Sequence, residues 1–287
     1  MTITVPAYAK INLFLDVHSV RENGYHNIIS FMQGVSLHDS VSVSLTDSDT
    51  KTISVFCNRS DIRCDKANLA YKAADIFPCT GDVSINIEKS IPMSAGLAGG
   101  SADCAATLIA LNKLTGEKLS LEELCALGAR LGADVPFCIK GGACLVEGIG
   151  EILTPIDSMP RFPIVIAKKG EGMSTPAAYG ALDAEFERFV SYKPQKEKLD
   201  ILLNAKQEIN IDELSRGVFN IFEVVVEPRR PCVTELKNTM LSFGAATAMM
   251  SGSGTSVFGI FERDADASKA VRALNEMGAD AHLCYPI

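Results

Sequence analysis

Apolar and polar residues alternate with a period of two over several short stretches of the chain. Residues 41–45, 53–56 and 83–87 follow this alternation, which predicts strands that bury one face against a core. Further strands are predicted from short, mainly apolar runs at Val5–Val17, Ala143–Val146, Ile164–Ala167, Val257–Phe261 and His282–Cys284.

Other stretches repeat apolar residues at helical spacing. They predict helices at Asn68–Phe77, Ser101–Leu114, Pro176–Phe189, Val233–Phe243 and Ala265–Met277. A capping box at residues 120–123 starts another helix, which is expected to run to Leu131 and stop at Gly132. Because strands and helices are unevenly mixed, the pattern favours an α+β fold over a doubly wound parallel sheet.

A proline cluster at Thr154–Pro163 is typical of a connection between domains. The length of 287 residues suits one large domain or two moderate ones. We therefore expect an N-terminal domain over residues 1–155 and a C-terminal domain over residues 156–287. The stretch Glu185–Glu213 matches no pattern that we can place.

Composition limits the classes of function. Hydrophobic residues make up 47% of the chain, which suits a globular fold, and the net charge of −8 argues against a nucleic-acid-coating surface. We expect no membrane span and no export signal, and hence a cytoplasmic protein. The nine cysteines have no C-x-x-C spacing and the four histidines are scattered, so we expect buried thiols and neither a disulfide framework nor a structural zinc site.

A run rich in glycine and alanine, residues 91–103, leads from the strand predicted over 83–87 into a predicted helix. Small residues allow a tight turn, and a helix start directs unpaired N–H groups and the positive end of the helix dipole at one point. Phosphate is the expected occupant. The run is neither a Walker A loop nor a dinucleotide fingerprint, and close packing of helix against strand is the alternative reading.

A second glycine- and serine-rich turn, Ser251–Thr255, is either another backbone nest for anions or a flexible turn. Two such turns in one chain favour a phosphate-rich substrate.

Three short segments contain polar or aromatic residues whose sequence surroundings suggest a function. Lys10 shares one predicted strand face with Asn12, which fits either an anion site or a solvated face. Asp134 lies between a glycine-containing helix end and a proline, as an Asx turn, a helix cap or a catalytic carboxylate. The pair Tyr25-His26 suits a planar ring, and an ordinary hairpin turn is the alternative.

Together these segments resemble the GHMP kinase superfamily, and they follow one another along the chain in the order that the superfamily has. The resemblance covers nearly the whole chain and rests on residues 9–15, 21–26, 92–101, 132–137, 148–151 and 252–254. It implies a two-domain GHMP kinase fold, with an N-terminal ribosomal protein S5 domain 2-like domain and a C-terminal ferredoxin-like α/β-plait domain.

Within the superfamily the resemblance implies an ATP-dependent kinase. It would phosphorylate the tertiary C2 hydroxyl of a cytidine-diphosphate-linked methylerythritol in the non-mevalonate isoprenoid pathway. The expected partner is thus this small-molecule substrate, and we expect neither nucleic acid nor a membrane as a partner. The protein is expected to be a monomer or a weak homodimer. ATP and Mg²⁺ would be needed, with Ser101 as a candidate metal ligand.

The resemblance also assigns residues to roles. Asp134 would be the general base and Lys10 would pair with it. The substrate would contact Asn12, Tyr25, His26, Thr175 and Tyr179. ATP would be bound by Lys89, near the adenine, and by Pro92, Met93, Ser94, Ala95, Gly96, Leu97, Ala98, Gly99, Gly100, Ser101 and Ala102.

Two alternatives remain within and beyond this family. Another small-molecule GHMP kinase, such as a homoserine or mevalonate kinase, has no cytosine to hold and no use for Tyr25-His26. A silent nucleotide-binding regulator would not need Lys10 and Asp134. The phosphate loop carries Ala95 and Ala98 where many members have glycine, and we expect ordinary backbone angles at both.

Overall fold

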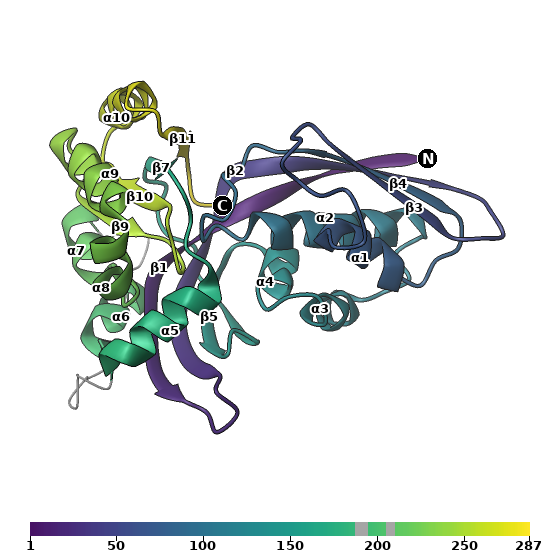
Figure 1. Cartoon of the computed structure of the whole chain (residues 1–287), viewed down its shortest axis with the longest axis horizontal. Helices are drawn as coiled ribbons and strands as arrows, with labels where there is room; N and C mark the ends of the chain where they lie inside the picture. The colour runs from purple at the N-terminus through teal and green to yellow at the C-terminus, as the bar shows by residue number, and fades with distance from the viewer. Residues whose placement is uncertain (187–194, 205–209) are drawn as a thin grey trace. The chain divides into compact units, whose positions relative to one another are not determined.

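The computed structural model describes residues 1–186, 195–204 and 210–287 (Figure 1). These residues form two compact units that are interleaved in the sequence. The first unit comprises residues 1–9, 37–91 and 98–141, and the second comprises residues 10–36, 92–97 and 142–287. The division expected at residues 155 and 156 stays a prediction.

Two long strands, β1 (Thr2–Val20) and β2 (His26–Thr46), contribute residues to both units. In the first unit β2 pairs antiparallel with β4 (Asp82–Glu88), which pairs in parallel with β3 (Thr52–Cys57). The predicted alternation is confirmed there, because the apolar side chains of β4 are buried and the polar ones between them are exposed.

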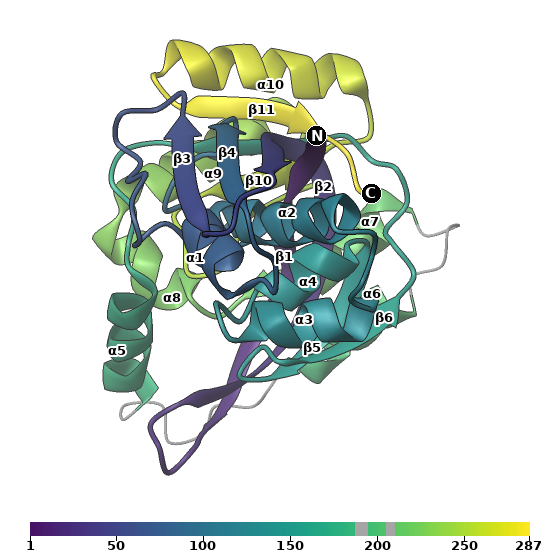
Figure 2. The same ribbon diagram turned by 90° about the vertical axis from the view of Figure 1, so that its right-hand side faces the viewer.

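Four helices of the first unit lie on one face of these strands, as Figures 1 and 2 both show: α1 (Leu69–Ile76), α2 (Gly99–Leu114), α3 (Leu121–Ala129) and α4 (Val135–Lys140). The Asn68 side chain caps α1 by accepting the Ala70 N–H. The capping box of α3 is confirmed, with Ser120 and Glu123 each accepting a backbone N–H. Alanines of α1 and α2 pack on the valines and isoleucines of the sheet.

In the second unit, β2 pairs antiparallel with β5 (Ala143–Gly148), which pairs with β6 (Ile152–Ile156), and β1 pairs in parallel with the two-residue β8 (Phe219–Asn220). A separate four-stranded sheet has the order β11-β7-β10-β9. Its strands are β7 (Ile164–Lys168), β9 (Thr247–Met250), β10 (Val257–Ile260) and β11 (Asp280–Cys284).

The helical segments of the second unit are α5 (Thr175–Phe186), α6 (Lys196–Leu203), α7 (Ile211–Gly217), α8 (Glu223–Val226), the 3-10 turn η1 (Glu227–Arg229), α9 (Pro231–Ser242) and α10 (Asp264–Glu276). Helix α9 contacts β9 and β10, and α10 contacts β11 and β7. The core of this unit lies between these helices and the four-stranded sheet.

Most predicted elements are confirmed within a few residues, and the differences have local causes. Helix α4 was not predicted, because Pro136 indicated a turn; proline is tolerated in a first helical turn, where no N–H is needed. The predicted connection at 154–163 begins inside β6, where Pro155 is compatible with an edge strand. Residues 187–189 of the predicted helix Pro176–Phe189 lie outside the described residues.

No helix in the described ranges combines the length and the apolar character needed to cross a membrane. The described residues include all nine cysteines, and none of them is joined in a disulfide. Burial raises the pKa of Cys104 to about 12, so this thiol stays protonated and inert at neutral pH.

Candidate active site

Helix α2 begins at Gly99, two residues before the predicted start, and its N-terminus has no side-chain cap. The N–H groups of Gly99, Gly100 and Ser101 have no acceptor among the hydrogen bonds of the described residues. Unpaired N–H groups at the start of a long helix are the arrangement that binds phosphate.

The backbone of Ala98 contradicts the prediction of ordinary angles. Ala98 is the N-cap of α2 and adopts the left-handed conformation, with φ of 59°, and Ser94 does so as well, with φ of 48°. A non-glycine residue pays about 1–2 kcal/mol for this conformation. The turn that starts α2 imposes it. At Ala95 the expectation of an ordinary φ is confirmed.

In the second unit, residues 92–97 are held by the turn at Ser251–Ser256. The Ser256 N–H donates to the Ala95 carbonyl at 3.2 Å, and the Ser251 hydroxyl donates to the Gly96 carbonyl at 3.1 Å. A Cβ at Gly96 would collide with the Ser251 carbonyl oxygen, so only glycine fits. Since Ser251, Thr255 and Ser256 are fully buried, the reading of this segment as a flexible turn is wrong.

Lys10 and Asn12 on β1 are buried, so the reading of a solvated strand face is wrong as well. The Lys10 Nζ donates to Asn12 Oδ1 at 2.7 Å, and Asn12 Nδ2 donates to the Ser30 hydroxyl at 2.8 Å. The backbone joins this group to the loop, because the Lys10 N–H donates to the Leu97 carbonyl at 3.2 Å. Among the described residues the Lys10 ammonium bonds only to this neutral amide, and such a positive charge without a counter-charge suits an anion.

Asp134 belongs to the first unit and occupies the N-cap position of α4. Its side chain makes no capping bond and has no hydrogen-bond partner among the described residues. The reading as an Asx turn or a side-chain cap is therefore wrong. Lys10 and Asp134 fall in different units, and their pairing stays a prediction.

The second unit brings the rings of His26 and Tyr179 together, and their proposed contacts with a cytosine stay predictions. Their ring centroids are 4.6 Å apart, and the His26 Nε2 lies 2.6 Å from Asp183 Oδ1. His26 is buried, whereas Tyr25, in the hairpin between β1 and β2, is 59% exposed. At the start of α5, the exposed Thr175 hydroxyl lies 3.0 Å from the Ser253 hydroxyl.

Sequence reasoning missed Asp183 and, although it singled out the turn that begins at Ser251, it missed the bonds that Ser251 makes. Asp183 follows Tyr179 by one helical turn, so the two share a face of α5; that spacing was the available signal. Ser251 accepts the Asn12 N–H at 3.3 Å and donates to Gly96, and so links β1 to the loop. No local sequence pattern predicts these bonds, because Ser251 is far from Asn12 and Gly96 in the chain.

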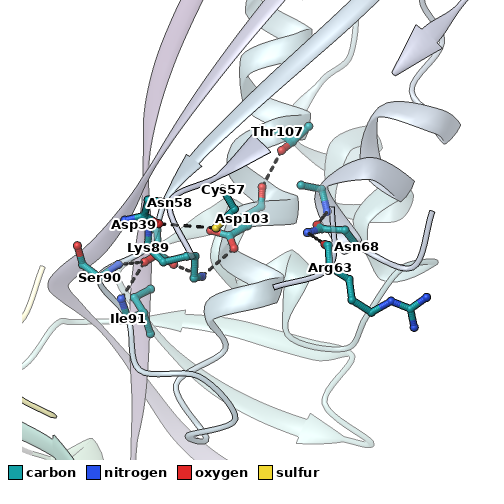
Figure 3. Close-up of polar contacts among 11 residues, drawn as sticks. Asp39, Cys57, Asn58, Arg63, Asn68, Lys89, Ser90, Ile91, Asp103 and Thr107 are labelled. Carbon is teal, nitrogen blue, oxygen red and sulfur yellow. Dashed lines mark hydrogen bonds and ion pairs between the residues drawn. The ribbon is translucent and has the colours of Figure 1, made fainter. Parts of the chain in front are cut away.

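Lys89, expected beside the adenine, is buried between Asp39 on β2 and Asp103 on α2 (Figure 3). Burial above all raises the pKa of Asp103, to about 7; Lys89 opposes this rise and Asp39 adds to it. Burial alone would lower the pKa of Lys89, but attraction to Asp103 and Asp39 outweighs it and the pKa is raised.

The described residues contain no group of three or more His, Cys, Asp and Glu side chains that could hold a metal ion. The Ser101 hydroxyl at the start of α2 is a single oxygen donor. Mg²⁺ commonly takes few protein ligands and fills its shell with phosphate oxygens and water. The residues present thus fit a metal ion that arrives with a nucleotide and do not fit one held by the protein alone.

Two family models match separate parts of the chain. Residues 68–142 match the GHMP kinases N terminal domain, and residues 199–280 match the GHMP kinases C terminal domain.

Curated relatives are similar over most of the chain. A 4-diphosphocytidyl-2-C-methyl-D-erythritol kinase from Caldicellulosiruptor saccharolyticus is 43% identical over 272 residues, which cover 93% of this chain and 91% of the relative. A kinase of the same name from Acetivibrio thermocellus is 41% identical, with 95% of each chain covered.

Solved structures give the same picture. A crystal structure of 4-(cytidine 5'-diphospho)-2C-methyl-D-erythritol kinase has a TM-score of 0.81 at 31% identity, with 99% of each chain covered. The mevalonate kinase of Methanococcus jannaschii has a TM-score of 0.75 at 15% identity, covering 100% of this chain and 98% of its own; at that identity it shows the fold alone.

Proposed function

The chain belongs to the GHMP kinases, and within them to the 4-diphosphocytidyl-2-C-methyl-D-erythritol kinases, and from this membership we propose its reaction and the roles of its residues. It transfers the γ-phosphoryl group of ATP to the C2 hydroxyl of 4-diphosphocytidyl-2-C-methyl-D-erythritol, giving the 2-phosphate and ADP. This is a step of the non-mevalonate route to isoprenoid precursors. Identity of 43% across 93% of the chain carries the assignment.

The loop at residues 92–98 and the start of α2 bind the ATP phosphates. Support comes from the three unpaired N–H groups of Gly99, Gly100 and Ser101, which the helix dipole reinforces. Mg²⁺ bound with ATP neutralises phosphate charge, and the Ser101 hydroxyl is its proposed protein ligand.

Asp134 accepts the proton of the C2 hydroxyl. As that proton leaves, the hydroxyl oxygen forms a bond to Pγ, the bond between Pγ and the β,γ-bridging oxygen breaks, and ADP departs. A tertiary alcohol is hindered and weakly acidic, so a positioned base is worth roughly 10²–10⁴ in rate. The carboxylate of Asp134 has no capping bond to give up, which supports this role. Lys10 is proposed to stabilise the anionic forms of the base and of the acceptor oxygen.

The cytosine ring is proposed to lie against Tyr25 and Tyr179, with His26 reading its edge. Because the Asp183 carboxylate can only accept a hydrogen bond, the nearby Nε2 of His26 is proposed to be the ring nitrogen that donates to it. Nδ1 of the neutral ring is then an acceptor, which suits the exocyclic amine of cytosine. Asn12 and Thr175 are proposed to position the methylerythritol unit.

We place this activity in the cytoplasm, where ATP is available and where nine free thiols stay reduced. A monomer or weak homodimer is the proposed state, and neither nucleic acid nor a membrane is a proposed partner.

The test is a coupled assay of ADP release with 4-diphosphocytidyl-2-C-methyl-D-erythritol as acceptor and with homoserine and mevalonate as controls. We expect turnover with the cytidyl substrate alone and a fall in kcat of about 10²–10⁴ in Asp134→Asn. Asp61→Asn, which alters a carboxylate that is 55% exposed, is the matched control and should keep full activity. Full activity in Asp134→Asn would refute the base; turnover only with another acceptor would refute the substrate.

A further inference from the structure

A buried ion-pair cluster contacts the chain segments that precede and follow residues 92–98 in the sequence. The Lys89 ammonium contacts Asp39 Oδ2 and lies 2.8 Å from Asp103 Oδ2. The three side chains are 4%, 0% and 8% exposed, respectively. We call these three residues the Lys89 cluster, which Figure 3 shows; Asp39 lies on β2, Lys89 directly follows β4, and Asp103 lies on α2.

Asp39 holds the chain just before the loop. Its Oδ1 accepts the N–H of Ser90 at 2.6 Å and the N–H of Ile91 at 2.8 Å. Since its other oxygen contacts Lys89, one carboxylate fixes both the lysine and the backbone that leads into residue 92.

Asp103 holds the chain just after the loop. It lies in the second turn of α2, four residues beyond Gly99, at which the helix begins. A Cβ added to Gly99 would come within 3.4 Å of the Lys89 Nζ, so the first turn of α2 lies directly against the ammonium. The lysine therefore lies against the first turn of α2 and is bonded to its second turn through Asp103.

The geometry points to Lys89, Asp39 and Asp103 as positioning residues that align the phosphate loop and the start of α2 for ATP without touching it. This inference rests on the proposed function in one respect, that ATP phosphates bind at this loop. It gives Lys89 a different role from the contact near adenine that the resemblance implies, because the ammonium is enclosed and bonded to two carboxylates.

Two variants loosen the two sides of the loop. Asp103→Ala removes the tie to α2 and leaves the pair of Lys89 and Asp39. Asp39→Asn keeps the size of the side chain but has a single acceptor oxygen, which cannot serve both Lys89 and the N–H groups of Ser90 and Ile91. Glu227→Gln is the control. Glu227 accepts a hydrogen bond from Lys237, which lies between two carboxylates as Lys89 does but makes no contact with residues 89–103 among the described contacts.

The measurement is calorimetric binding of the ATP analogue AMP-PNP with Mg²⁺, together with KM for ATP, KM for the cytidyl substrate, and thermal unfolding as a check of folding. We expect the Kd for AMP-PNP and the KM for ATP to rise about tenfold in Asp103→Ala and in Asp39→Asn. The KM for the cytidyl substrate should stay within about twofold of wild type. Glu227→Gln should leave all three constants unchanged.

Two results would overturn the inference. Tighter AMP-PNP binding in Asp103→Ala would show that the freed ammonium is itself a phosphate ligand. Unchanged nucleotide binding in folded variants, or equal rises in both KM values, would reduce the cluster to a general stabiliser. If one variant does not fold, the other decides alone. Wild type that binds AMP-PNP yet does not phosphorylate the cytidyl substrate would refute the substrate assignment and leave this test intact.

Discussion

Two clusters with the same composition, one lysine between two carboxylates, occur in the two units. In the Lys89 cluster of the first unit no side chain is more than 8% exposed. In the Lys237 cluster of the second unit, formed with Glu223 and Glu227, exposure ranges from 14% to 29%. Each cluster also holds backbone beside a glycine-containing loop, because Glu223 Oε1 accepts the N–H of Met250 at 2.8 Å, next to Ser251.

From their difference in exposure we expect burial, more than composition, to set the energetic contribution of such a cluster. Water can solvate the surplus negative charge of the Lys237 cluster, but the surplus of the Lys89 cluster has only protein around it. The Asp103 Oδ1, for example, is buried without a hydrogen-bond partner in the described part of the chain. We therefore expect the Lys89 cluster to be the more sensitive of the two to substitution.

Removing each lysine should give the largest contrast. Lys89→Met leaves two buried carboxylates without a counter-charge, and we expect the free energy of unfolding to fall by about 3–5 kcal/mol. Lys237→Met should lower it by about 1–2 kcal/mol, since water reaches that site. Urea unfolding of both variants at one pH measures the contrast, and equal losses would contradict the role given to burial.

The pH dependence of stability should separate the clusters next. The pKa of Asp103 is raised from 3.8 to about 7, so the folded state holds its proton more tightly and the free energy of unfolding falls as pH rises from about 4 to about 7. Burial also raises the pKa of Glu223, although Lys237 opposes this rise. The free energy of unfolding that Glu223 contributes therefore falls as pH rises above the ordinary pKa of 4.5.

Asp103→Asn and Glu223→Gln each remove one of these titrations. Relative to wild type, Asp103→Asn should gain stability as pH rises through this window, by a few kcal/mol at most. Glu223→Gln should gain in the same direction and by less. Urea unfolding at several pH values tests this, and a profile of Asp103→Asn parallel to that of wild type would refute the raised pKa.

Most of the fold could be predicted because a sheet covered on one face leaves a period of two in its strands, as residues 83–87 show. The turn into α2 at the phosphate loop was also anticipated, whereas the direct contact of the His26 and Tyr179 rings was not. The Lys89 cluster could not be, since Lys89 and Asp39 are 50 residues apart and no local period links them. Lys10 was undecided for the same reason, because its burial depends on tertiary packing.

The smallest expected effects concern the loop at residues 92–98 and the turn at Ser251–Ser256. In the loop, Ala98 adopts the left-handed conformation; in the turn, Gly252 adopts it, with φ of 58°. Ala98→Gly should relieve strain and raise the free energy of unfolding by up to about 1 kcal/mol, after the entropy that glycine gains in the unfolded chain is deducted. Gly252→Ala should lower it by about 1–2 kcal/mol.

Thermal unfolding of the two variants measures both signs. A loss of stability in Ala98→Gly would show that the start of α2 depends on the alanine methyl group more than on its backbone angle.

The interleaving of the two units constrains how the chain is made. The first unit needs residues up to 141, and the β1 segment of the second unit pairs with β8 only after residue 220 has been synthesised. No single cut separates the units, and β1 can complete its pairing with β8 only late in synthesis. Contacts of such large sequence separation form slowly, so the second unit is the later of the two to complete its strand pairing.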